Sequence, residues 1–302
     1  MEFAYGSLLD AKKARVAVLV RCRLLLSEPN IMPLWQILVL AVVQGITEFL
    51  PISSDGHLVL TANLLNQNAD QLDVSSVVIA LHMGTLASII VFYWHRLWAL
   101  LREDRRLIPM LIIGTIPAVV LGLPIKFLAE KEILESPLLA GIMLPVTGLA
   151  LIWSSRRPLG KTDYRQLNWR EAMAIGVAQA AAILPGLSRS GSTIATALGL
   201  GLTRQSAATF SFLLAVPALA GAGVLELIKV ARKGDFQPAA EPLDLGIGIV
   251  ISFVVGLGAL WVLVRMLERG RFAIFGWYCI ILGVAVTVWQ LSLLAGPTGA
   301  SH

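Results

Sequence analysis

The sequence is poor in charged residues. Only 14% of its 302 residues are Asp, Glu, Lys or Arg, whereas 57% are hydrophobic and the mean hydropathy is +0.78. Soluble domains carry about 25% charged residues, so the composition excludes an ordinary soluble domain. The long alternating strands of a membrane barrel are also missing from the sequence. What remains is a polytopic membrane protein that is built from helices.

Cysteine is scarce too. Cys22 and Cys279 are the two cysteines of the sequence, and they lie far apart without the spacing of metal ligands. A disulfide framework is therefore not expected. The net charge is +5. In a membrane protein such an excess reflects loop topology, so we expect no nucleic-acid partner.

Residues 44–57, QGITEFLPISSDGH, are unusually polar for so apolar a chain. A charged side chain at the centre of a membrane helix costs about 2.5–3.5 kcal/mol, and a Leu or Ile returns only about 0.3–0.6 kcal/mol. Glu48 alone thus requires roughly six apolar residues to offset it. A polar cluster of this kind indicates a functional site. A polar loop at the membrane surface is the alternative, which a matching polar stretch at 178–193 weakens.

Proline divides this first stretch into two short helices. The pattern predicts a helix over 35–50 that Pro51 ends, and Ser53 or Ser54 can cap a second helix over 55–65. These helices would be about 24 Å and about 17 Å long, whereas the hydrocarbon core is about 30 Å thick. A re-entrant hairpin with its tip inside the membrane is therefore expected, buried in protein or beside a wet cavity.

The same order recurs in the second half of the chain. A second broken hairpin is expected at 170–201, interrupted at Pro185-Gly186. Six spanning helices are expected at 74–93, 107–128, 137–153, 206–228, 245–264 and 273–294. A hairpin followed by three spans thus occurs twice, and an odd number of crossings in each half inverts the second half. The expected fold is an all-α polytopic membrane protein with an inverted-topology repeat, six spanning helices and two re-entrant helix hairpins, and its site lies at the midplane.

This repeat defines the expected domain organisation. We expect an N-terminal extension at 1–31, a single membrane domain at 32–294 and a C-terminal tail at 295–302. Within the membrane domain, repeat one covers 34–155 and repeat two covers 170–294.

Loop charges predict the orientation. The loops 94–106, 154–170 and 265–272 are rich in arginine, whereas 66–73 and 129–136 carry a net negative charge. By the positive-inside rule the arginine-rich loops are cytoplasmic. The first hairpin then enters from outside and the second from the cytoplasm.

The first hairpin offers two kinds of chemistry. Gln44 and Glu48 are spaced i, i+4 and face the same side of a helix, where their oxygens could bind a divalent cation. Ser54 lies at the break, where free N–H groups of the second helix can hold phosphate. His57 follows about one turn later, and a Ser–His pair suits nucleophilic or acid–base catalysis. Ser54 is the preferred nucleophile with His57 or Glu48 as its base, and His57 is the alternative nucleophile.

The second hairpin reads PGLSRSGST over 185–193. Its Arg189 has a planar fork that can pair bidentately with phosphate, which points to an anionic substrate. Alternatively Arg189 only pairs with Glu48 or Asp55 and so holds the two halves together. The candidate phosphate contacts of both hairpins are hydroxyl or glycine residues: Ser53, Gly186, Ser188, Ser190 and Thr193.

Both stretches carry family motifs. A Glu/Gln-x-x-x-Glu pattern that runs into Pro-x-Ser-Ser-x-Gly-His stands at 44–57, and Pro-Gly-x-Ser-Arg-Ser-x-x-Thr stands complete at 185–193. Over roughly 32–294 the chain resembles the undecaprenyl-diphosphate phosphatase family of the bacitracin-resistance type. The resemblance implies a bacterial inner-membrane enzyme that cleaves the terminal phosphate from the C55 lipid diphosphate at a site open to the periplasm. Its product would be the carrier lipid for cell-wall synthesis, and its activity would give bacitracin resistance.

The resemblance also implies residue roles and a cofactor. Glu48, Ser54, His57 and Arg189 match the catalytic positions of the family, and a Mg²⁺ or Ca²⁺ requirement is implied. Asp55 departs from the family, where Thr or Ser is commoner at this position. It is expected to be a metal ligand beside Gln44 and Glu48, or a partner of Arg189. Undecaprenyl diphosphate and membrane lipid are the expected partners, and a homodimer is left open.

Two other classes of membrane protein share some of these features. Inverted repeats with broken helices are also transporter architecture, but a transporter has no need of a Ser–His pair beside an acid, so an enzyme is favoured. The other membrane phosphatase superfamily requires a Pro-Ser-Gly-His motif that the sequence does not contain. His82, inside an expected span, is interpreted as a structural histidine.

Overall fold

The computed structural model describes residues 32–65, 75–122, 124–125, 133, 136–233 and 240–295. In this part of the chain the secondary structure is helical, apart from a β-bridge between Thr162 and Leu202. The all-α class expected from composition is confirmed. The expected extension at 1–31 and the tail after residue 295 lie outside the described residues.

The helices follow one another in the order expected from the apolar runs. They are α2 (Leu34–Thr47), α3 (Ser54–Leu65), α4 (Ser75–Phe92), α5 (Trp94–Arg102), α6 (Leu107–Pro117), α9 (Pro137–Ser155), α10 (Trp169–Ala181), α11 (Arg189–Gly199), α12 (Arg204–Lys233), α13 (Pro242–Glu268) and α14 (Ala273–Ala295). Two short helical segments complete the list: a π-helix η2 (Ala118–Gly122) and a 3-10 helix η3 (Tyr164–Gln166).

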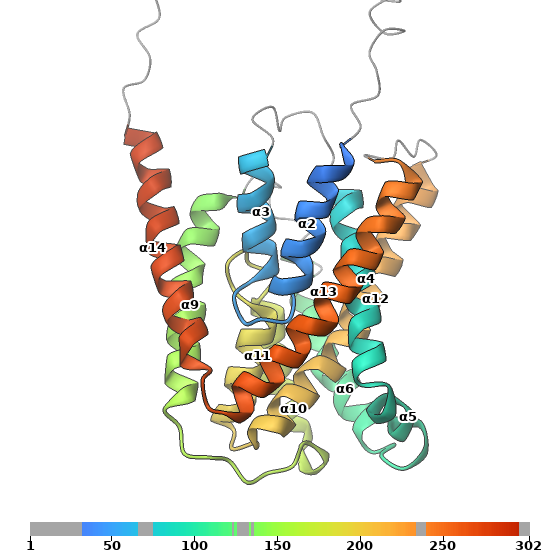
Figure 1. Ribbon diagram of the computed structural model, residues 1–302. Coiled ribbons are helices and arrows are strands. Elements are labelled where there is room, and N and C mark those ends of the chain that lie inside the picture. The colour runs from blue at the N-terminus through green and yellow to red at the C-terminus, as the bar shows by residue number, and fades with distance from the viewer. Residues whose placement is uncertain are drawn as a thin grey trace, which may run out of the picture.

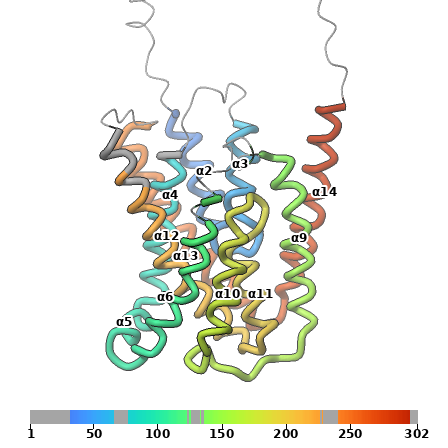
Figure 2. The backbone as a smooth tube through the Cα atoms, turned by 180° about the vertical axis from the view of Figure 1, so that it is seen from behind, coloured from blue at the N-terminus to red at the C-terminus, as the bar shows by residue number. Residues whose placement is uncertain are grey.

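Two helical hairpins approach each other from opposite ends of the bundle. In Figure 1, α2 and α3 descend from the upper end, whereas α10 and α11 rise from the lower end. Figure 2 shows the same arrangement from behind. The tips meet in the middle, and α9 contacts both α3 and α11. The turns therefore lie near the centre of the long axis, between α9 and α4.

Four helices are long and apolar enough to cross a membrane: Pro137–Ser155, Arg204–Leu225, Pro242–Glu268 and Ala273–Ala295. A fifth crossing is possible where Val77–Phe92 and Trp94–Arg102 form a pair bent by 67°. Of the span expected at 107–128, the structure describes α6, which contains Pro117, the π-helix η2, which ends at Gly122, and two further helical residues at 124–125. The described residues thus contain four to five candidate spans, and the count of six stays a prediction.

Small residues allow close packing between helices near the tips. A Cβ atom added to Gly176 of α10 would lie 2.3 Å from the carbonyl oxygen of Gly114 in α6. A Cβ atom added to Gly148 of α9 would lie 2.5 Å from the carbonyl oxygen of Gly276 in α14. Such contacts need glycine, as is common where membrane helices pack. The first contact holds α10 against α6, and the second holds α9 against α14.

Candidate active site

The break of the first hairpin has an unusual backbone. Ser53 has a φ of +70°, in the left-handed region that non-glycine residues rarely adopt. Its hydroxyl oxygen accepts hydrogen bonds from the backbone N–H of Gly56, at 3.4 Å, and of Gly186 in the other hairpin, at 3.1 Å. Ser53 therefore caps α3 and joins the two tips. This contact brings the chemistry-bearing residues of the two motifs together.

Gly186 is required by the geometry of the second tip. Its φ is +88°, and an added Cβ atom would lie 2.3 Å from the carbonyl oxygen of Ala140. Its carbonyl accepts a hydrogen bond from the Thr147 hydroxyl at 2.9 Å. A side chain at this position would force the tip away from α9.

We expect Gly186→Ala to destabilise the protein well beyond Gly201→Ala. Both glycines have a φ near +90°, but nothing lies within 4 Å of a Cβ atom added to Gly201. The control variant therefore shows the conformational cost alone, about 1–2 kcal/mol, and Gly186→Ala adds the steric clash. Melting temperatures of the purified variants in one detergent measure the difference. Equal melting temperatures would mean that the tip moves without cost.

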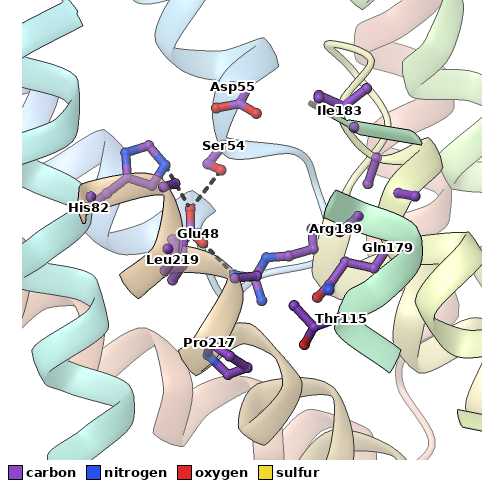
Figure 3. Close-up of a pocket in the computed structure, with 18 of the residues that line it drawn as sticks. Glu48, Ser54, Asp55, His82, Thr115, Gln179, Ile183, Arg189, Pro217 and Leu219 are labelled. Atoms are coloured by element: carbon purple, nitrogen blue, oxygen red, sulfur yellow. Dashed lines mark hydrogen bonds and ion pairs between the residues drawn. The ribbon is translucent and has the colours of Figure 1, made fainter. Parts of the chain in front are cut away.

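Glu48 is the centre of the site. Glu48 is 5% exposed, and one of its carboxylate oxygens forms an ion pair with Nη2 of Arg189 (Figure 3). The other oxygen accepts hydrogen bonds from the Ser54 hydroxyl at 2.8 Å and from the Gln44 amide at 3.0 Å. His82 Nε2 lies 3.5 Å from this second oxygen. The pairing of Glu48 with Arg189, one of the alternatives from the sequence, is confirmed, and it links the two hairpins.

His82 belongs to this cluster, whereas its sequence context predicts a structural histidine. Its Nδ1 lies 2.8 Å from the carbonyl oxygen of Val78 and donates to it, since a carbonyl only accepts. Nε2 then faces the Glu48 carboxylate, 3.5 Å from one of its oxygens. No spacing rule connects residues 48 and 82, so the intramembrane position of His82 was the available signal.

The structure does not bring His57 to Ser54 as expected. Its Nδ1 lies 2.8 Å from the carbonyl oxygen of Ser53, and its Nε2 lies 2.8 Å from the hydroxyl of Tyr278 on α14. The two rings also stack, with centroids 5.8 Å apart. One turn of helix does separate Ser54 from His57, but the imidazole points toward α14, outside the cavity. This corrects the expected Ser–His contact.

The hydroxyls of the second hairpin point into the protein. Ser188 caps α11 by accepting the N–H of Gly191 at 3.1 Å, and Ser190 lies 3.2 Å from the Ser188 hydroxyl. Thr193 donates to the backbone oxygen of Arg189 at 2.8 Å. All three hydroxyl residues are at most 1% exposed, and none of them lines the cavity. They shape the tip in this structure, and direct phosphate contact through them stays a prediction.

A cavity of about 430 Å³ lies where the tips meet α4, α6 and α12. Most of its wall is apolar. Its polar lining residues are Glu48, Ser53, Ser54, Asp55, His82, Thr115, Gln179 and Arg189. Thr115 and Gln179 were not singled out from the sequence, because neither lies within a recognised motif.

The expected cation ligands do not form a closed metal site. Among the described residues there is no group of three or more His, Cys, Asp or Glu side chains that could hold a metal ion. Gln44 is fully buried, is not a lining residue and donates its amide to Glu48. Both Glu48 oxygens already accept hydrogen bonds. Of the three expected ligands, Glu48 and Asp55 line the cavity.

Comparisons with known proteins identify the family of this chain. The family model "Bacitracin resistance protein BacA" matches residues 37–285. The undecaprenyl-diphosphatase of Rhodopirellula baltica is 46% identical over 256 residues, which cover 85% of this chain and 98% of the relative. The enzymes of the same name from Psychrobacter sp. and Korarchaeum cryptofilum are each 39% identical and cover 82% and 87% of this chain, and 92% and 100% of the relatives. The chain therefore belongs to the bacitracin resistance protein BacA family.

Proposed function

We propose that the protein hydrolyses undecaprenyl diphosphate to undecaprenyl phosphate and inorganic phosphate. One observation carries the proposal: the Ser54 hydroxyl lies 2.8 Å from a buried carboxylate that also pairs with an intramembrane arginine, at the wall of a largely apolar cavity. A lipid diphosphate needs both features, because its prenyl chain requires an apolar cavity and its phosphates require a positively charged side chain. The relatives named undecaprenyl-diphosphatase support this choice. The activity recycles the carrier lipid for cell-wall synthesis and gives bacitracin resistance.

Ser54 is the nucleophile in this proposal. Its oxygen attacks the terminal phosphorus while its proton passes to Glu48, the nearest carboxylate. A bond forms between the Ser54 oxygen and phosphorus, and the bond from phosphorus to the bridging oxygen breaks. The electron pair leaves on the bridging oxygen, which stays with the lipid monophosphate. Arg189 lowers the cost of the charge that develops on the phosphoryl oxygens.

Water completes the reaction. It attacks the phosphoserine and releases inorganic phosphate, which keeps the protons of the water, while Glu48 returns to the Ser54 oxygen the proton that it took in the first step. His82, near the same carboxylate, can hold Glu48 in place through both steps. Glu48 is preferred over His57 as the base, because the imidazole of His57 is bonded to Ser53 and Tyr278. His57 would have to leave both partners before it could act on Ser54.

The proposal includes a divalent cation, Mg²⁺ or Ca²⁺, with Asp55 as a carboxylate ligand. Mg²⁺ usually binds one or two carboxylates together with substrate phosphates and water, and Asp55 lines the cavity next to Ser54. A bound cation would neutralise charge on the diphosphate.

The proposed topology is an inverted repeat in a bacterial inner membrane, with six spans and two re-entrant hairpins. The arginine-rich loops 94–106 and 155–168 gather at the lower end in Figure 1. The cavity lining extends the other way, to Val78 near the start of α4 and to Leu225 in the second half of α12. By the positive-inside rule the lower end is cytoplasmic, so the cavity would open toward the periplasm.

Cysteine labelling of intact cells tests this topology. With the native cysteines removed, a cysteine placed in loop 129–136 should react with a membrane-impermeant maleimide. One placed at Leu159, which is 67% exposed, should react only after the cells are opened. The reverse pattern would contradict the proposed orientation.

Phosphate release separates an enzyme from a transporter. Purified protein in detergent should release inorganic phosphate from undecaprenyl diphosphate, and the rate should fall when EDTA removes divalent cations and recover when Mg²⁺ or Ca²⁺ is added. A lipid transporter would bind the diphosphate without releasing phosphate. A rate unchanged by EDTA would remove the cation from the proposal and leave the hydrolase in place.

A further inference from the structure

The cavity wall holds an amide without hydrogen-bond partners. Gln179 of α10 is 5% exposed, and its Nε2 and Oε1 atoms are both buried with no hydrogen-bond partner. Nη1 of Arg189 is also buried and has no hydrogen-bond partner. Buried polar groups in proteins are normally hydrogen-bonded, and leaving them unpaired is costly. Three unpaired polar atoms on two residues that line one cavity indicate a polar ligand between them.

The fold holds Gln179 in this position. Gly176, one turn before it, packs against Gly114 of α6 closely enough to exclude a Cβ atom. The π-helix η2 follows α6 directly at the cavity wall, and π-helical turns occur frequently at functional sites. The amide thus lies where two helices pack tightly, and Figure 3 shows its end beside Thr115.

Gln179 and the nucleophile lie at different places beside Arg189. In Figure 3 Ser54 lies above the guanidinium of Arg189, and the amide of Gln179 lies to its right. In phosphoryl transfer the attacking and leaving oxygens are roughly in line on opposite sides of phosphorus. With Ser54 attacking the terminal phosphate, the leaving group is the phosphate that stays on the lipid. In-line transfer therefore requires a place for that second phosphate away from Ser54, and Gln179 is a polar lining residue that can supply it.

An apolar groove begins at the same end of the cavity. It lies between α6 and α12, and it shares Thr115, Val119 and Pro217 with the cavity wall. Its other lining residues are all apolar: Leu97, Ile108, Leu111, Ile112, Ile116, Val120, Leu213 and Val216. A prenyl chain that lies in this groove would place its own phosphate at the junction, beside Thr115 and Gln179.

We propose that the Gln179 amide, together with Nη1 of Arg189, binds the phosphate group that remains on the lipid. This inference rests on the proposed function. Nε2 donates to an oxygen of that phosphate, where negative charge increases as the bridging bond breaks, and Oε1 accepts from the P–OH of the protonated monophosphate product. The contact orients the diphosphate with its terminal phosphate at Ser54. Gln179 is then a substrate-binding residue outside both family motifs.

The test compares Gln179→Leu with a matched control, Gln36→Leu. Gln36 is 8% exposed and also has a buried Oε1 without a partner, but it lies in α2 and does not line the cavity. Two inhibitors of phosphate release are used: farnesyl phosphate, which carries only the lipid-side phosphate, and inorganic phosphate. Gln179→Leu should weaken inhibition by farnesyl phosphate at least tenfold and change inhibition by inorganic phosphate less than twofold. Gln36→Leu should change neither.

A second variant covers the case in which Gln179→Leu does not fold. Gln179→Glu keeps the size of the side chain but replaces its donor with a negative charge, so it should weaken inhibition by farnesyl phosphate at least as much. Weaker inhibition by inorganic phosphate alone would assign the amide to the terminal phosphate and overturn the proposal. Behaviour like that of Gln36→Leu would also overturn it.

The inference and the proposed function fail differently. If the native protein releases no phosphate from the lipid diphosphate, the proposed function is wrong. Calorimetric titration of the native protein and the two leucine variants with farnesyl phosphate still reports on the amide. Binding that is lost in Gln179→Leu and kept in Gln36→Leu supports the subsite without turnover. Binding kept in both variants rejects it.

Discussion

Replacing Ser54 with alanine is expected to lower phosphate release at least a hundredfold, a loss of about 2.7 kcal/mol of transition-state stabilisation. Ser54 is the first residue of α3, and its hydroxyl lies 2.8 Å from a carboxylate oxygen of Glu48. The N–H groups at the start of this helix can hold the phosphoryl oxygens during transfer. Alanine removes the nucleophile and leaves the helix and the Glu48–Arg189 pair in place. Rates at saturating undecaprenyl diphosphate measure the effect, and the variant should still bind farnesyl diphosphate.

A control serine and a trapped intermediate complete this test. Ser292→Ala should have normal activity, because its hydroxyl only contacts the backbone oxygen of Trp289 at the exposed end of α14. Rapid acid quenching of the native enzyme with substrate labelled at the terminal phosphate should give phosphoserine at residue 54. If Ser54→Ala keeps more than a tenth of the rate, or if the label is found on His57, Ser54 is not the nucleophile.

Replacing Arg189 with lysine is expected to lower activity at least tenfold, or by more than about 1.4 kcal/mol in transition-state energy. Nη2 of Arg189 pairs with Glu48, while Nη1 has no partner and is available to a phosphate. Lysine keeps one positive charge but cannot serve both groups with a planar fork. The measured quantity is the rate of phosphate release divided by KM, with the melting temperature as a check on folding.

The lysine variant separates catalysis from stability. Arg189→Ala would leave a buried carboxylate unpaired, at a cost of about 3–5 kcal/mol, so a loss of activity there would be ambiguous. Arg165→Lys is the control, because Arg165 forms an exposed ion pair with Asp104 at 2.8 Å, and such pairs contribute little. Near-normal turnover of Arg189→Lys would show that Arg189 acts only as the counter-ion of Glu48.

Much of this protein could be predicted from the sequence by rules that concern composition and short stretches of chain. Composition determined the helical membrane class, because a chain with so few charges cannot form an ordinary soluble surface. Proline indicated the first break, because Pro51 lies in the turn between α2 and α3, although α2 ends at Thr47, three residues before the predicted end. The pairing of Glu48 with Arg189 was anticipated because a buried charge needs a partner. Each of these depends on backbone geometry or on the cost of burial.

The directions of the side chains required the tertiary structure. His57 points to Tyr278 and His82 points to Glu48, although the spacing along the chain favoured His57. Sequence spacing determines which residues share a turn of helix, but helices that pack from distant parts of the chain determine which side of that turn faces the cavity. The buried amide of Gln179 became visible for the same reason, because only the packing of α10 against α6 shows that its polar atoms have no partner in the protein.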